Sequence, residues 1–184
     1  MGAENKSSKL ERYIELDLPH VIKHKKLKID IETSPDGLSW TTHDLKTLNP
    51  NQLRELLHEA QSPLIIAEGL MMYFTHNEFE HLVSLLAAEL SPRGGQLIFD
   101  WVPTIEQPPP GLIGQSLGAL MRLFTGGESF IRDERSRESI KNLLQVYGAQ
   151  EVQMIDTHKV AHSRSLPYPE AKTQQLIFSA HFGC

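Results

Sequence analysis

Short apolar segments alternate with helix-like segments along the first two-thirds of the chain. Residues 13–18, Leu38–Thr42, Leu64–Ala67 and residues 96–102 have the composition of strands. The run at Leu64–Ala67 is almost entirely apolar, which is typical of a strand buried in a parallel sheet. Alternation of strands with helices predicts a parallel sheet wrapped by helices, an α/β fold.

Capping signals mark where the intervening helices begin. Asn49 followed by Pro50 predicts one helix start, and Thr75 with Glu78 three residues later predicts a capping box at another. A further amphipathic helix is expected over residues 132–147, and closing strands over residues 151–155 and 175–180.

Composition narrows the classes of protein that fit. The 184 residues suit a single domain, with residues 1–10 as a flexible lead. The net charge of −5 gives no general attraction to nucleic acid or to anionic lipid, and no apolar run is long enough to span a bilayer. One cysteine and no signal peptide favour a reducing compartment, so we expect a cytoplasmic protein.

Acidic residues fall where the expected strands end. Asp17, Asp44 and Glu68 follow three of them, and Asp100 lies near the end of the next. In a parallel α/β sheet, ligands bind outside the carboxyl ends of the strands. Single acidic residues at strand ends are common, but three or four at one crevice are difficult to explain by solubility alone.

Three motifs carry a family resemblance. They are Y-I-E-L-D-L-P-x-V-I-x-x-K (13–25), D-L (44–45) and I-I-A-E-G-L-M-M-Y-F (65–74). Together they resemble the leucine carboxyl methyltransferase family, and most closely its branch of polyketide-type O-methyltransferases related to the tetracenomycin O-methyltransferase. The likeness covers residues 12–102 well and the rest loosely.

The resemblance implies a class I methyltransferase fold, Rossmann-like, that binds S-adenosylmethionine (SAM). It implies that Asp17 holds the ribose hydroxyls, that Asp44 and Leu45 flank the adenine, and that Glu68 lies beside the methionine portion. Tyr73 is a weaker candidate that would offer an aromatic face near the cation, although a core or lid role suits it better. No metal site is expected.

The implied activity is transfer of a methyl group from sulfur to the oxygen of a small-molecule carboxylate or phenol. Such a reaction depends on in-line positioning and on desolvation of the nucleophile. A phenol would need a general base, and the sequence nominates none. Residues 104–130, rich in Pro, Gly and Met, are expected to cover the acceptor. Methylation of a protein C-terminal carboxylate is a further alternative.

The family's opening section has no counterpart in this sequence. Family members begin with a helical segment, an arginine and then a strand that ends in a glycine-rich loop, which cradles the methionine. Residues 1–10 of this sequence hold one glycine and no apolar strand. We therefore expect a sheet that lacks its first strand and glycine-rich loop, and weak or absent SAM binding by this chain alone. A catalytically inactive remnant that acts as a binding module is the alternative.

Other motifs carry less weight. Ser116 lies in a G-x-S-x-G pattern, but a proline run replaces the strand that a nucleophile elbow needs. The pairs His20/His24 and His158/His162 are spaced for a shared helix face, yet neither has a third ligand. A nicotinamide dehydrogenase would also place an acid like Asp17 on a ribose, but its glycine fingerprint is missing.

Overall fold

The computed structural model describes residues 12–28, 37–102, 131, 133–157 and 175–183. Contacts divide the chain into two compact units, Met1–Leu48 and Asn49–Cys184, and each is described by itself. Within the described residues, no helix combines the length and the apolar character needed to cross a membrane. The predictions for residues 1–10, 104–130, Ser116 and the pair His158/His162 lie outside the described residues.

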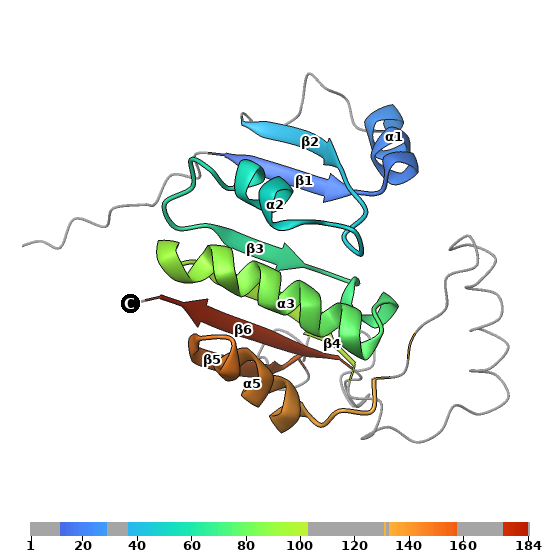
Figure 1. Cartoon of the computed structure of the whole chain (residues 1–184). Helices are drawn as coiled ribbons and strands as arrows, with labels where there is room; N and C mark the ends of the chain where they lie inside the picture. The colour runs from blue at the N-terminus through green and yellow to red at the C-terminus, as the bar shows by residue number, and fades with distance from the viewer. Residues whose placement is uncertain (1–11, 29–36, 103–130, 132, 158–174, 184) are drawn as a thin grey trace, which may run out of the picture. The chain divides into compact units, whose positions relative to one another are not determined.

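The first unit is a β-α-β segment. Strand β1 (Tyr13–Asp17) leads into helix α1 (Pro19–Lys28), and strand β2 (Leu38–Thr42) follows. The two strands pair in parallel, with Tyr13 opposite Leu38 and Asp17 opposite Thr42 (Figure 1). Pro19 occupies the first helical position, where the missing N–H has no helical partner to lose. The predicted parallel pairing of these strands is confirmed.

The second unit holds a four-stranded sheet with helices along it. In chain order its elements are α2 (Pro50–Leu56), β3 (Leu64–Ala67), η2 (Met71–Tyr73), α3 (His76–Leu90), η3 (Ser91–Arg93), β4 (Gln96–Trp101), α5 (Arg137–Val146), β5 (Ala149–Asp156) and β6 (Leu176–Phe182). The strand order is β3-β4-β6-β5. Strands β3 and β4 are parallel, whereas β6 runs antiparallel to both of its neighbours, β4 and β5.

Side-chain caps set the helix starts. The Asn49 side chain accepts from the Gln52 backbone N–H, and Thr75 and Glu78 form the reciprocal bonds of the predicted capping box. The expected helix over residues 132–147 is too long at its N-terminal end. Ser136 Oγ accepts from the backbone N–H of Ser139, which starts α5 at Arg137 and leaves residues 133–136 outside the helix.

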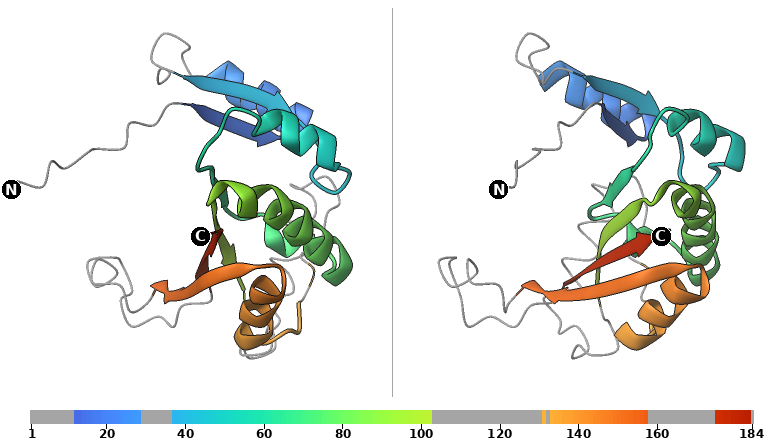
Figure 2. Two further views of the ribbon diagram at one scale, coloured as in Figure 1. Left: turned by 60° about the vertical axis from the view of Figure 1, so that its left-hand side comes forward. Right: turned by 90° about the vertical axis from the view of Figure 1, so that its left-hand side faces the viewer.

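The core of the second unit lies between α3 and the sheet. The Phe79 ring of α3 meets Phe99 of β4 edge-on at 5.8 Å, and Phe99 stacks on Phe178 of β6 at 5.2 Å. Val83 and Leu97 are completely buried in the same layer. Helices α3 and α5 lie along the same face of the sheet (Figure 2). Burial of these aromatic side chains is the main source of stability for this unit.

Strand β3 departs from the expected full burial. Its parallel pairing with β4 is as predicted, and Ala67 is buried. Leu64 and Ile66, however, are 53% and 63% exposed. They alternate with Ile65 and Ala67, so they point to the face opposite the one that packs on α3. In the part of the chain that the structure describes, β3 is an edge strand with one apolar face in solvent.

Candidate functional site

In the first unit, the ends of two parallel strands bring the predicted cofactor residues together. Asp17 is the last residue of β1, and the backbone N–H of His43, just after β2, donates to its carbonyl oxygen at 3.3 Å. Asp44 follows and is exposed, with Oδ1 accepting from the backbone N–H of Lys46 at 2.9 Å. Leu45 beside it is half-buried. Asp17, Asp44 and Leu45 therefore share the carboxyl end of this two-stranded sheet.

Asp17 has a cationic neighbour that the sequence reasoning missed. The Nζ of Lys25, in α1, lies 3.3 Å from Asp17 Oδ2 and forms a very short contact with Glu15 Oε1. The hydrogen bond that Lys25 donates to Glu15 raises the pKa of Lys25, and Asp17 adds to this, although partial burial opposes it. Asp17 Oδ1 also accepts from the N–H of Leu18 at 2.8 Å. Glu15 and Asp17 are two residues apart on β1 and share one face of it, but no period links them to Lys25 on α1.

In the second unit, Glu68 and Asp100 lie at the carboxyl ends of neighbouring parallel strands. Glu68 comes directly after β3 and is exposed. Asp100 Oδ1 accepts from the backbone N–H of Gly69 at 2.6 Å, and its Oδ2 accepts from Gln175 at 3.2 Å. Gly69 has a φ of +63°, so the chain turns sharply after Glu68. Asp100 thus fixes the turn that presents the Glu68 carboxylate.

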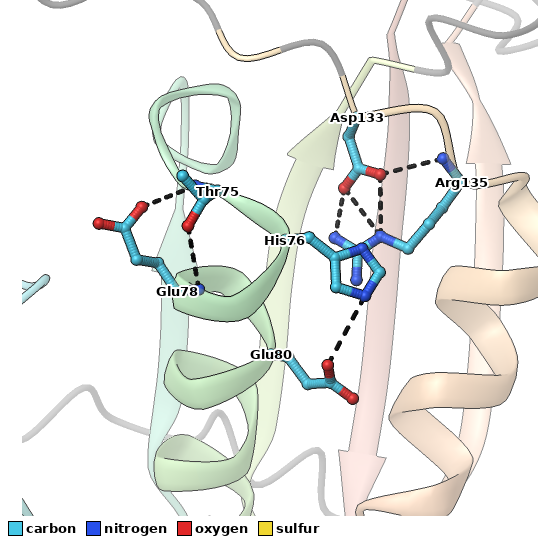
Figure 3. Close-up of polar contacts among 6 residues, drawn as sticks. All are labelled: Thr75, His76, Glu78, Glu80, Asp133 and Arg135. Atoms are coloured by element: carbon cyan, nitrogen blue, oxygen red, sulfur yellow. Dashed lines mark hydrogen bonds and ion pairs between the residues drawn. The ribbon is translucent and has the colours of Figure 1, made fainter.

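The structure also builds a pocket that the sequence did not indicate. The backbone N–H of Ile131 donates to the carbonyl of Met72 at 2.8 Å, which ties the segment before α5 to η2. Asp133 and Arg135 of that segment pair through Nε, at 2.8 and 2.9 Å, and through a very short contact from Nη2. Figure 3 shows this pair beside His76, at the start of α3.

The Asp133 carboxylate is held in its ionised form. Burial, the largest single influence, raises its pKa, but hydrogen bonds and charge from Arg135 and a hydrogen bond from Trp101 together lower the pKa below its ordinary value. Trp101 ends β4, so Asp133 anchors the segment to the carboxyl end of the sheet. The Arg135 guanidinium also lies 4.5 Å from the centre of the Phe79 ring.

His76 completes the wall of this pocket. Its Nε2 lies 3.6 Å from Glu80 Oε2, one turn along α3 (Figure 3). The pocket has a volume of about 360 Å³ and is lined by His76, Ile131, Asp133, Glu134 and Arg135. The only sequence signal for it was the density of charged residues at the start of the helix expected over residues 132–147.

The other candidates are placed as follows. Tyr73 is half-buried in η2. His20 and His24 lie exposed on α1, and no group of three potential metal ligands comes together among the residues that the structure describes. Glu68 belongs to a different unit from Asp17 and Asp44, so convergence of the three carboxylates on one mouth stays a prediction.

The predicted cofactor residues suit an adenosyl group in their chemistry. Asp44 and Glu68 are exposed at strand ends, and a carboxylate oxygen has a second acceptor site after one hydrogen bond. That second site lets Asp17 receive a ribose hydroxyl while it still accepts from Leu18. A Cβ built on Gly69 would meet nothing within 4 Å, so there is open space beside Glu68.

No protein-family model and no curated protein matches the sequence. Solved structures do match its fold. Human N-acetylserotonin methyltransferase in complex with SAM is 16% identical, with a TM-score of 0.56 over 94% of this chain. An O-methyltransferase family protein from Burkholderia thailandensis is 12% identical, with a TM-score of 0.59 over 94%. A SAM-dependent methyltransferase from Mesorhizobium loti is 19% identical, with a TM-score of 0.60 over 92%.

The lengths of these proteins differ from that of this chain. The chain spans 41% of the human enzyme and 44% of the Burkholderia thailandensis protein, but 80% of the Mesorhizobium loti protein. At these identities the likeness is one of fold. The chain has the fold of class I SAM-dependent methyltransferases, as the resemblance in its motifs predicted.

Proposed function

We propose that the chain serves SAM-dependent O-methylation of a small-molecule carboxylate or phenol. The observation that carries this proposal is the set of carboxylates at the ends of parallel strands in a methyltransferase fold. Asp17 and Asp44 end one parallel pair, and Glu68 ends the other beside Asp100. Parallel strand ends are where α/β folds bind their ligands.

Each residue has a role that its chemistry supports. SAM supplies a methyl group on a positively charged sulfur. Asp17 would accept hydrogen bonds from the ribose diol, and Asp44 with Leu45 would flank the adenine. Glu68 would lower the energy of the positive charge at the methionine end, because a bound cofactor would exclude water and so reduce the screening between the two charges. The chain then contributes position and desolvation rather than covalent chemistry.

The cofactor residues are tested by calorimetric titration of the purified chain with SAM and with its demethylated product. We expect binding that is weak, with a Kd of about 100 μM or above, and that weakens further in Glu68→Gln. Micromolar affinity would contradict the expected weakness. No heat at millimolar ligand would contradict the proposed function itself.

A catalytically inactive binding module is the second candidate. The contacts of Lys25 with Glu15 and Asp17 favour it, because the ammonium group competes with a ribose hydroxyl for one of the two Asp17 carboxylate oxygens. Lys25→Met removes that competitor. If the variant binds the demethylated product more tightly than the unmodified chain does, the Asp17 site is intact and the enzyme proposal is strengthened. If neither protein binds, the module reading is favoured.

A further inference from the structure

The pocket beside α3 contains a buried donor with no acceptor. Arg135 donates to Asp133 through Nε and Nη2, and its third nitrogen, Nη1, takes no part in this pair. Nη1 exposes less than 1 Å² and has no hydrogen-bond partner among the described residues. A guanidinium stays protonated at every accessible pH, so Nη1 always carries two N–H donors. A buried donor left without an acceptor is unfavourable, and an incoming oxygen atom would relieve that cost.

The charge around this donor selects the kind of oxygen. The positive charge of Arg135 is already matched by the Asp133 carboxylate. Glu134 also lines the pocket, and Glu80 lies within ion-pair distance of His76. An anionic ligand would therefore meet surplus negative charge, whereas a neutral carbonyl oxygen would gain the hydrogen bond without the repulsion.

The pocket has one apolar wall beside its charged and polar ones. Ile131 lines it, and the guanidinium that would donate is itself stacked over the Phe79 ring. Its volume of about 360 Å³ falls in the range of small-molecule sites. The His76 side chain beside it is 56% exposed, so packing does not hold it in one position.

We propose that this pocket binds the methyl acceptor through a neutral carbonyl oxygen, which receives its hydrogen bond from Nη1 of Arg135. The acceptor is then a hydroxyaryl ketone or a related carbonyl compound rather than a carboxylate. That the ligand is the methyl acceptor rests on the proposed function. The pocket's preference for a neutral carbonyl over a carboxylate is independent of that function, because it can be measured without SAM.

Two probes of nearly equal shape test the preference. 4′-Hydroxyacetophenone carries a neutral acetyl group, and 4-hydroxybenzoate carries a carboxylate in its place. The complete chain is titrated with each and followed by ¹H–¹⁵N NMR shifts at residues 76, 131 and 133–135. We expect the ketone to bind about tenfold more tightly than the benzoate. Equal affinity, tighter binding of the benzoate or no binding of the ketone overturns the proposal.

Arg135→Lys identifies the donor. The lysine ammonium can still pair with Asp133, but it lacks the second arm that Nη1 provides. We expect about a tenfold loss of ketone binding in this variant. Arg54→Lys, at an arginine that pairs with Glu89 outside the pocket, is the matched control and should bind the ketone normally. Unchanged ketone binding in Arg135→Lys overturns the proposal, and thermal melts of both variants verify that they fold.

A separate titration with the demethylated cofactor product keeps two failures apart. Ketone binding without cofactor binding would leave the carbonyl site standing and remove the methyltransferase proposal. Cofactor binding without ketone binding would leave the methyltransferase proposal standing and remove the assignment of this pocket.

Discussion

Asp100 and Gly69 connect the ends of two parallel strands through a hydrogen bond of 2.6 Å from the Gly69 N–H to Asp100 Oδ1. We predict that Asp100→Ala frees the turn that presents Glu68. The variant should lose about 1 kcal/mol of unfolding free energy and bind the demethylated cofactor product more weakly. Asp100→Asn keeps an acceptor oxygen and is the control. Equal losses in the two variants, measured by urea denaturation and calorimetry, would contradict the role of this bond.

The Asp133–Arg135 pair should make stability depend on acid pH. The folded-state pKa of Asp133 lies below its ordinary value of 3.8. Its contribution is therefore fully present above the unfolded-state pKa and is lost as the pH falls through the folded-state pKa. We predict that Asp133→Asn is less stable than the unmodified chain at pH 6 and that the gap narrows toward pH 2. Urea denaturation across this range measures it, and a constant gap would contradict the prediction.

Glu89 is a buried carboxylate that two arginines share. Arg54 of α2 donates to its Oε1 at 3.0 Å, and Arg93 of η3 donates to its Oε2 at 3.0 Å. Glu89 is only 6% exposed. We predict that Glu89→Gln lowers the unfolding free energy by about 3 kcal/mol, because it leaves charges without their partner in the fold.

The Arg54 side chain is 60% exposed. Arg54→Ala should therefore cost less than about 1 kcal/mol. A double-mutant cycle between the two positions measures their coupling. A loss in Arg54→Ala as large as that in Glu89→Gln would mean that the solvent-facing arginine dominates the cluster.

Gly183 and Gly94 give a matched pair of glycine positions. Both have positive φ angles, of 85° and 63°. A Cβ at position 183 would lie 2.5 Å from the carbonyl oxygen of Ser91, whereas one at position 94 would meet nothing within 4 Å. We predict that Gly94→Ala costs about 1 kcal/mol and that Gly183→Ala costs clearly more. Thermal or urea denaturation ranks them, and a reversed order would contradict the close approach.

The exposed face of β3 should govern self-association. Ile66 is 63% exposed on an edge strand, an arrangement that invites pairing with other chains. We predict that Ile66→Thr changes the unfolding free energy by no more than about 0.5 kcal/mol and reduces association in sedimentation velocity runs. Leu97→Thr, at a fully buried position of β4, is the contrast and should cost about 3 kcal/mol. Unchanged association in Ile66→Thr would show that the exposed face of β3 does not mediate self-association.

The strands and helix starts could be predicted because their signals are local. Apolar runs such as Leu64–Ala67 are marked by their composition, and the Thr75–Glu78 box spans one helical turn. The predicted start of α5 was too early. The amphipathic pattern continues N-terminal to Ser136, whereas the helix begins only after this capping residue. A capping serine inside a periodic stretch is easily read as one more polar position.

The candidate site was predictable only in part. Strand ends revealed Asp17, Asp44, Glu68 and Asp100, since position in a parallel sheet follows from chain order. Contacts between segments did not follow in the same way. Arg135 meets Phe79 of α3, far away in sequence, and no spacing rule signals that contact.

The placement of β6 has a consequence for how the second unit forms. Strand β6 lies between β4 and β5, and the Gln96 side chain of β4 donates to Ser179 of β6 across 83 residues of sequence. On a ribosome, β5 emerges before β6, which is its neighbour among the strands that the structure describes, so β5 cannot yet pair with it. Until β6 is made, the Phe99 ring of the β3–β4 pair lacks Phe178, the β6 ring on which it stacks. Nascent chains paused before residue 176 should accordingly be the forms that chaperones hold.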